Sequence, residues 1–124
     1  MAKNAAEKML IKKGSTVTLI DAPNGYTKAL KDMAADAIIS RAPEKADVVQ
    51  VFVNSLDEAR SKLPKLSKAL RSDSIFWVAY PKSSARKSDI NRDSLREYGA
   101  TIGLKAVSLF AVDSEWSAMR FKSK

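Results

Sequence analysis

The sequence contains no cysteine and no histidine. Without cysteine the chain can form no disulfide, no thiolate nucleophile and no zinc–thiolate or iron–sulfur site. Without histidine it lacks the commonest general base near neutral pH and the commonest metal ligand, which excludes a Ser-His-Asp or Cys-His arrangement within this chain. Catalysis would have to rest on Asp, Glu, Lys, Tyr or Ser, or on a bound cofactor. These absences favour a protein that is not an enzyme, and we expect neither a metal site nor a cofactor.

Long apolar runs are also missing. No stretch approaches the roughly 20 apolar residues that a membrane-spanning helix needs. Residues 1–10 are mixed polar and lack the apolar stretch of a signal peptide. We therefore expect no membrane association and a cytoplasmic location.

The chain is as long as one typical domain, with 124 residues. A domain of this length buries roughly two-thirds of the surface that its unfolded chain exposes, which is enough for one hydrophobic core without metals or disulfides. Neither a repeat nor a linker rich in glycine or serine divides the sequence. Residues 1–124 are therefore predicted to form a single domain, in which residues 1–13 form a short helix or a partly ordered arm.

The charge balance is basic, with 22 Lys and Arg against 14 Asp and Glu and a net charge of +8. Such a charge attracts nucleic acids, acidic lipids or anionic metabolites. The basic residues are spread over the whole chain, however, and most have no aromatic residue between them. A nucleic-acid surface would favour basic residues on one face with interleaved aromatics. This spread is more typical of a solvated surface.

Periodicity predicts alternating strands and helices. Short β-branched or apolar runs predict strands over 16–20, 37–39, 47–53 and 74–80, followed by a hairpin of 104–112 and 116–121. Helices are predicted over 26–35, after Asn54 and Ser55, and over 89–102. Pro64 lies inside the second of these and should kink it or start a second helical segment.

This order predicts the fold class. Alternating strands and helices form a mostly parallel sheet with helices on both faces, and right-handed crossovers give a Rossmann-like α/β domain. The C-terminal hairpin is antiparallel and places one antiparallel strand at or next to an edge of the sheet.

Five segments carry a resemblance to known proteins: LIDAPNGY at 19–26, VFVNS at 51–55, FWVAYPKSS at 76–84, DINRD at 89–93 and VDSEWSAMRF at 112–121. The chain resembles a family of short bacterial α/β proteins whose fold is similar to a truncated class I methyltransferase. The resemblance implies a fold and no mechanism. Two departures from the methyltransferase pattern argue against the usual binding of S-adenosylmethionine: the turn after the first strand holds one glycine and a proline, and the region after the second strand lacks an acidic residue.

Ligands of open α/β sheets bind at the carboxyl ends of the strands, where four loops should meet. Lys82, beside two serines and ahead of a helix, is a candidate anion site. Tyr80 and Trp116 are expected to form an aromatic wall. The full set of candidate ligand-binding residues is Asp21, Asn24, Asn54, Ser55, Tyr80, Lys82, Ser83, Ser84, Asp113 and Trp116.

Each candidate also has a structural interpretation. The two aspartates could cap turns or pair with Lys82 or Arg120, Asn54 and Ser55 could cap a helix, and Trp116 could pack at a sheet edge. The serines could belong to a flexible loop with Lys82 solvated.

Four classes of function follow. The favoured hypothesis is a non-catalytic binding module for a small anionic ligand, phosphate- or nucleotide-like, at the carboxyl ends of the strands. The alternatives are a nucleic-acid-associated basic protein, a scaffold or regulatory domain that binds other proteins, and an enzyme that uses Asp21 or Asp113 with Lys82.

Overall fold

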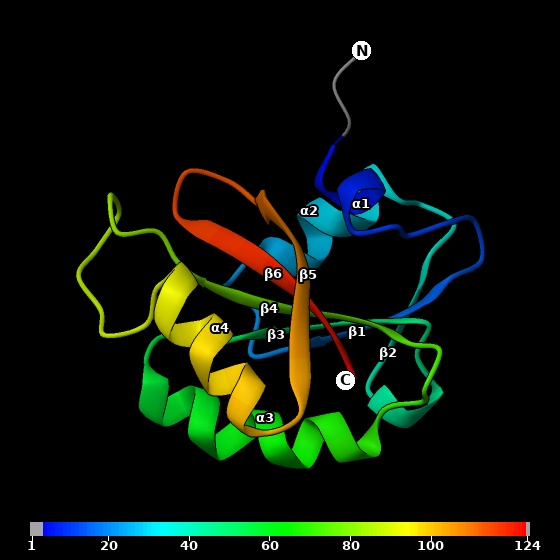
Figure 1. Ribbon diagram of the computed structural model, residues 1–124. Helices are drawn as coiled ribbons and strands as arrows, with labels where there is room; N and C mark the ends of the chain where they lie inside the picture. The colour runs from blue at the N-terminus through cyan, green and yellow to red at the C-terminus, as the bar shows by residue number, and fades with distance from the viewer. Residues whose placement is uncertain (1–3, 124) are drawn as a thin grey trace.

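A computed structural model describes residues 4–123 as one six-stranded sheet with helices on both faces (Figure 1). The strand order is β2-β1-β3-β4-β6-β5. The strands are β1 (Thr16–Ile20), β2 (Ile38–Ser40), β3 (Val48–Phe52), β4 (Ile75–Pro81), β5 (Leu104–Ala111) and β6 (Trp116–Ser123). The first four are parallel, and β6 runs antiparallel between β4 and β5. The predicted fold class and the antiparallel strand next to an edge are confirmed.

The helices form two layers that enclose two apolar clusters. Helices α3 (Leu56–Ala69) and α4 (Arg92–Thr101) cover one face, and α1 (Ala5–Lys8) and α2 (Tyr26–Met33) cover the other, as Figure 1 shows. Strand β3 is buried over all five residues because alternate side chains enter both clusters. We call these two sides the α3 face and the α2 face.

The helix starts follow from their caps. Oγ of Ser55 accepts a hydrogen bond from the Glu58 backbone and begins α3. Helix α4 begins at Arg92, later than predicted, because Asn91 and Ser94 form a capping box and Oδ1 of Asp89 instead accepts from the backbone nitrogen of Leu56. Helix α3 continues through Pro64 to Ala69, so of the two predicted effects of this proline, a kink or a second helical segment, the second does not occur.

The N-terminal segment is part of the core. Asn4 and Glu7 form a capping box at the start of α1, and Ala6 and Met9 are buried against the α2 face. The predicted short helix at 1–13 is thus present over 5–8, and residues 1–3 lie outside the described residues. No helix within residues 4–123 is long and apolar enough to span a membrane.

Candidate functional site

The four predicted loops lie at the same edge of the sheet. Strands β1, β3 and β4 are parallel, and β5 points the same way because β6 is antiparallel to both of its neighbours. Direct contacts join three of these loops: the backbone nitrogen of Lys82 donates to the carbonyl of Glu115 at 2.8 Å, and Arg86 contacts both Asn54 and Trp116. The carboxyl edge therefore gathers the segments that strand polarity predicts.

Tyr80 and Trp116 do not form one aromatic wall. Tyr80 is in register with Ser117 and belongs to the cluster on the α3 face. Trp116, one residue earlier on β6, is in register with Pro81 and packs on the α2 face, 5.0 Å edge-to-face from Phe52. Because successive side chains of a strand point to opposite faces, the two rings are separated by the sheet.

Asp21 is held by a lysine that sequence analysis did not single out. Nζ of Lys62 lies 2.8 Å from Oδ2 of Asp21 and 3.0 Å from Oε1 of Glu58, and it donates to the carbonyl of Phe52 at 3.2 Å. Partial burial would lower the pKa of Lys62, but the hydrogen bonds to Asp21 and Glu58 outweigh it and raise this pKa. The four-residue spacing of Glu58 and Lys62 on a helix was the signal available in the sequence.

Asn54 and Trp116 are joined by Arg86. The Arg86 guanidinium donates to Oδ1 of Asn54 at 2.6 Å, and its central carbon lies 4.8 Å from the centre of the Trp116 ring. Oγ of Ser88 donates to the Asn54 carbonyl at 2.6 Å. These bonds fasten the loop after β4 to the loop after β3.

Ser55 and Asp113 serve backbone groups. Ser55 caps α3, as described above, and Oδ1 of Asp113 accepts from the backbone nitrogens of Glu115 and Trp116 at 2.8 and 2.9 Å. Asp113 therefore shapes the β5–β6 turn. Within residues 4–123, neither Asp113 nor Asp21 forms an ion pair with Lys82 or Arg120. The Asn24 side chain is exposed and forms no hydrogen bond within residues 4–123.

The remaining candidates line a cleft of about 410 Å³ at the carboxyl end of β4, which we call the β4 cleft. Its cations are Lys82 and Arg92, and its serines are Ser83, Ser84 and Ser117. Within the described chain, the Lys82 ammonium makes no ion pair, and the hydroxyls of the two loop serines make no hydrogen bond. Lys82, Ser83 and Ser84 are therefore available to a ligand.

The exposed Arg92 and the buried Tyr80 both line the β4 cleft. Burial raises the pKa of Tyr80, while the nearby Arg92 charge and a hydrogen bond with Ser117 oppose the shift. The only carboxylate lining the cleft belongs to Asp93, and it is 2.8 Å from Arg96 and 3.7 Å from Arg92. Because cations already surround this carboxylate, its charge is largely compensated.

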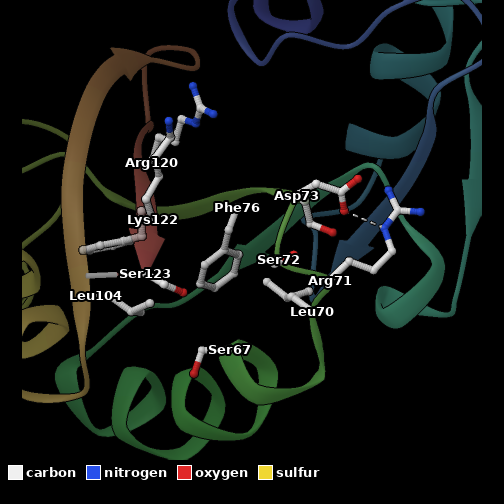
Figure 2. Close-up of a pocket in the computed structure, with 12 residues that line it drawn as sticks. Ser67, Leu70, Arg71, Ser72, Asp73, Phe76, Leu104, Arg120, Lys122 and Ser123 are labelled. Atoms are coloured by element: carbon white, nitrogen blue, oxygen red, sulfur yellow. Dashed lines mark ion pairs between the residues drawn. The ribbon is translucent and has the colours of Figure 1, made fainter.

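A second hollow, of about 320 Å³, lies at the opposite edge, around the start of β4 (Figure 2). Phe76 and Leu104 form its apolar floor, and Arg71 and Asp73 stand at its rim. The Arg71 guanidinium is bound to Asp47 at 2.6 Å and to Asp73 at 3.1 Å, as Figure 2 shows for Asp73. The Arg120 side chain points away from Phe76 in this view. Arg71 is therefore already paired, whereas Arg120, which also lines this hollow, forms no ion pair within residues 4–123.

No group of three or more acidic side chains that could hold a metal ion occurs within residues 4–123. With no histidine or cysteine in the chain, oxygen ligands alone would be available to a metal.

Searches with family models and against curated proteins gave no match. Solved structures did match. An O-methyltransferase from neocarzinostatin biosynthesis, in complex with S-adenosylmethionine and a naphthoic acid, superposes with a TM-score of 0.67 at 14% identity over 90% of this chain and 49% of its own. The mitomycin 7-O-methyltransferase superposes with a TM-score of 0.62 at 12% identity, over 97% of this chain and 53% of its own. A tRNA methyltransferase from B. subtilis superposes with a TM-score of 0.56 at 8% identity, over 97% of this chain and 64% of its own.

The fold is methyltransferase-like. It is a truncated Rossmann-like form of the class I methyltransferase fold, as the sequence resemblance implied. The chain spans about half the length of the first two methyltransferases. At these identities the likeness concerns the fold alone.

Proposed function

We propose that this methyltransferase-like domain is a binding module for a small anion that carries a phosphate or a similar group. The ligand binds in the β4 cleft. The observation that carries this proposal is the contrast between two sets of polar groups at the carboxyl edge. Asp21, Asn54 and Asp113 are engaged with other groups of the protein, whereas Lys82, Ser83 and Ser84 are not.

The chemistry of the β4 cleft suits an anion. Lys82 supplies positive charge, Arg92 adds a cation that lies 3.7 Å from Asp93, and the serine hydroxyls of the cleft can donate hydrogen bonds to oxyanion oxygens. Tyr80 and Leu109 add an apolar wall on the α3 face that could hold the non-polar part of a larger ligand. No side chain in this set is arranged as an acid–base pair around a nucleophile, so the proposal includes no catalytic step.

S-adenosylmethionine is a less favoured ligand. One structural neighbour binds it, which supports a small-ligand role for this fold. In this chain, however, the crevice between β1 and β3, where the strand order reverses, is the place where Lys62 pairs with both Asp21 and Glu58. A ligand entering there would have to break these ion pairs.

The test is calorimetric titration of the purified chain with pyrophosphate, ATP and S-adenosylmethionine at low and high salt. We expect a phosphate-bearing ligand to bind, and Lys82→Ala combined with Ser84→Ala to weaken binding about tenfold or more, since a hydrogen bond to a charged group contributes about 1.5 kcal/mol or more. The thermal stability of this double variant should be nearly unchanged, because neither side chain forms a hydrogen bond or an ion pair within residues 4–123.

Lys87→Ala is the matched control, because Lys87 is an exposed lysine of the same loop that does not line the β4 cleft. Equal losses in Lys87→Ala and Lys82→Ala would show a diffuse basic surface instead of a cleft. Binding of S-adenosylmethionine that depends on Asp21 and not on Lys82 would move the site to the first loop and overturn the proposal. Binding of RNA alone, abolished by salt, would favour the nucleic-acid alternative.

A further inference from the structure

One crossover of the sheet lacks an α-helix. The connections from β1 to β2, from β3 to β4 and from β4 to β5 carry α2, α3 and α4 respectively. The connection from β2 to β3 carries only a 3₁₀ turn, η1 (Pro43–Lys45). Crossover helices cover the faces of a parallel sheet. The α3 face therefore lacks the helix that would cover its β2 side.

The uncovered region is apolar. Ile38 on β2 is 56% exposed, and it is in register with Thr16 on β1. Thr16 and Ile20 lie on the same side of β1 because they are four residues apart on a strand, and Ile20 packs against the cluster of the α3 face. Ile38 and Ile20 therefore point to the same side of the sheet, with the buried Thr18 between Thr16 and Ile20 on β1.

A groove of about 350 Å³ lies along α3 beside Ile20 of β1. It is lined by Ile20, Ser61, Lys62, Lys65, Leu66 and Ala69, and we call it the α3 groove. Its exposed surface is almost entirely apolar, since the lysines contribute their methylene chains to the walls while their charges reach water. An apolar groove with a charged rim is typical of a protein-binding surface.

The rim of the α3 groove is basic. Between residues 59 and 72 the sequence has five basic side chains and no acidic one: Arg60, Lys62, Lys65, Lys68 and Arg71. Three of these are paired with acidic side chains outside this stretch. Lys65 and Lys68 have no ion pair within residues 4–123. The groove is therefore flanked by positive charge that the described chain does not neutralise.

We propose that the α3 groove binds an amphipathic helix of a partner protein, with an apolar stripe that fills the groove and acidic side chains that face Lys65 and Lys68. This helix takes the place of the missing crossover helix. The same charge argues against a second copy of this chain, because a two-fold contact at this groove would bring each copy's own lysines together.

The test uses a fluorescent peptide of roughly 18 residues, long enough to form a helix in isolation. Its leucines are spaced i, i+3, i+4 and i+7, and glutamates flank the stripe. We expect binding, measured by fluorescence anisotropy, to weaken at least tenfold in Lys65→Glu and in Ala69→Glu. A peptide with lysine in place of glutamate should not bind.

Two matched controls make the same chemical changes elsewhere. Lys105→Glu lies on β5 at the opposite edge of the sheet, and Ala85→Glu lies in the exposed loop after β4. Both should bind the acidic peptide as the unmodified chain does, and circular dichroism should show that all four variants keep the fold.

Three outcomes would overturn the proposal. The first is peptide binding that Lys65→Glu and Ala69→Glu leave unchanged. The second is dimerisation of the chain in sedimentation experiments that Ala69→Glu abolishes, which would make the α3 groove a self-interface. The third is displacement of the peptide by oligouridylate, which would assign the basic rim to nucleic acid.

Discussion

Tyr26 carries a buried hydroxyl from the first turn of α2 to the middle of the sheet. This hydroxyl donates to Oε1 of Gln50 at 2.6 Å and lies 3.7 Å from Sδ of Met9. Burial raises the pKa of Tyr26 from 10.0 to about 12; the bond to Gln50 opposes this shift, and the Asp113 charge adds to it. The folded state therefore requires the neutral phenol.

This requirement predicts a loss of stability in alkali. The pKa of Tyr26 is higher in the folded state than in the unfolded state. The stabilisation of the folded state by the neutral phenol is therefore complete below pH 10.0 and is lost as the pH rises toward about 12. A shift of this size corresponds to about 2–3 kcal/mol in the free energy of unfolding. Urea unfolding measured across this pH range should show a shallower alkaline decline in Tyr26→Phe than in the unmodified chain.

Tyr98→Phe is the control, since Tyr98 is only partly buried at the surface of α4, and it should keep the full alkaline decline. At neutral pH, Tyr26→Phe should itself cost about 1–3 kcal/mol because it leaves Oε1 of Gln50 buried without its donor. Parallel pH curves for Tyr26→Phe and the unmodified chain would contradict the assignment.

For single residues, the sequence predicted their positions in the fold better than it predicted their side-chain contacts. Strand polarity located Asp21, Asn54 and Asp113 in loops at one edge, and Ser55 was recognisable as a helix cap. The pairing of Asp21 with Lys62 and of Arg86 with Trp116 joins positions far apart in the chain, so no local pattern indicates it. Binding by the β4 cleft residues stays a prediction.

Among the elements, α4 packs against β6 through Gly99. A Cβ built at this buried position would lie 2.5 Å from Cε1 of Phe121. The Phe121 ring is itself buried in the cluster of the α3 face and cannot swing into solvent. The absence of a side chain at Gly99 is therefore what lets the helix approach the sheet.

Gly99→Ala should destabilise the protein. Alanine favours a helix over glycine by up to about 1 kcal/mol, but overpacking a closed core costs about 1–3 kcal/mol. We expect the second effect to prevail and the urea midpoint to fall. Adding Phe121→Leu should recover part of the loss in a double-mutant cycle, because a smaller side chain relieves the contact. Strict additivity of the two changes would show that they do not interact.

Pro64 in α3 is a residue whose replacement by alanine should stabilise the protein, in contrast to Gly99. It lies in the middle of a helix of 14 residues and supplies no backbone N–H for the carbonyl of Arg60. Pro64→Ala should therefore stabilise the protein, by up to about 3 kcal/mol on the helix-propensity scale. Thermal unfolding measures this directly. Lys65→Ala is the control, and a fall in melting temperature in Pro64→Ala would mean that the ring makes packing contacts worth more than the hydrogen bond.

Element types were predictable and element ends were less so. All six strands and the helices α2, α3 and α4 lie within a few residues of their predicted positions. The start of α4 was placed too early because Asp89 and Asn91 both look like caps, and only the tertiary bond from Leu56 to Asp89 separates their roles. Whether Pro64 breaks a helix likewise depends on packing that the local sequence does not contain.

For the whole molecule, strand order was more predictable than sheet register. Alternation and right-handed crossovers constrain which strands are neighbours. The error of joining Tyr80 and Trp116 arose because the register of β6 against β4 decides which residues share a face, and a shift of one residue exchanges the faces. The candidate site was therefore located at the correct edge but spread over both sides of the sheet.

The N-terminal segment closes the α2 face from a distance of 68 residues. The backbone carbonyl of Met9 accepts a hydrogen bond at 3.1 Å from Nε1 of Trp77 on β4. The Met9 side chain is 0% exposed, whereas its neighbour Leu10 is 39% exposed. The sequence predicted either a short helix or a partly ordered arm for residues 1–13. The described part of this segment contributes to the core on the α2 face.

Met9→Ala should therefore lower the free energy of unfolding by about 2–5 kcal/mol, the usual cost of removing a fully buried large side chain. The matched change Leu10→Ala should cost far less, because its side chain is partly in water already. Denaturant unfolding gives both values, and tryptophan emission, to which Trp77 and Trp116 both contribute, reports whether the indoles of the α2 face become exposed. If Met9→Ala instead behaves like Leu10→Ala, the buried Met9 side chain adds little to the stability of the α2 face. The backbone carbonyl that accepts from Trp77 is kept in this variant, so the measurement reports the packing of the Met9 side chain alone.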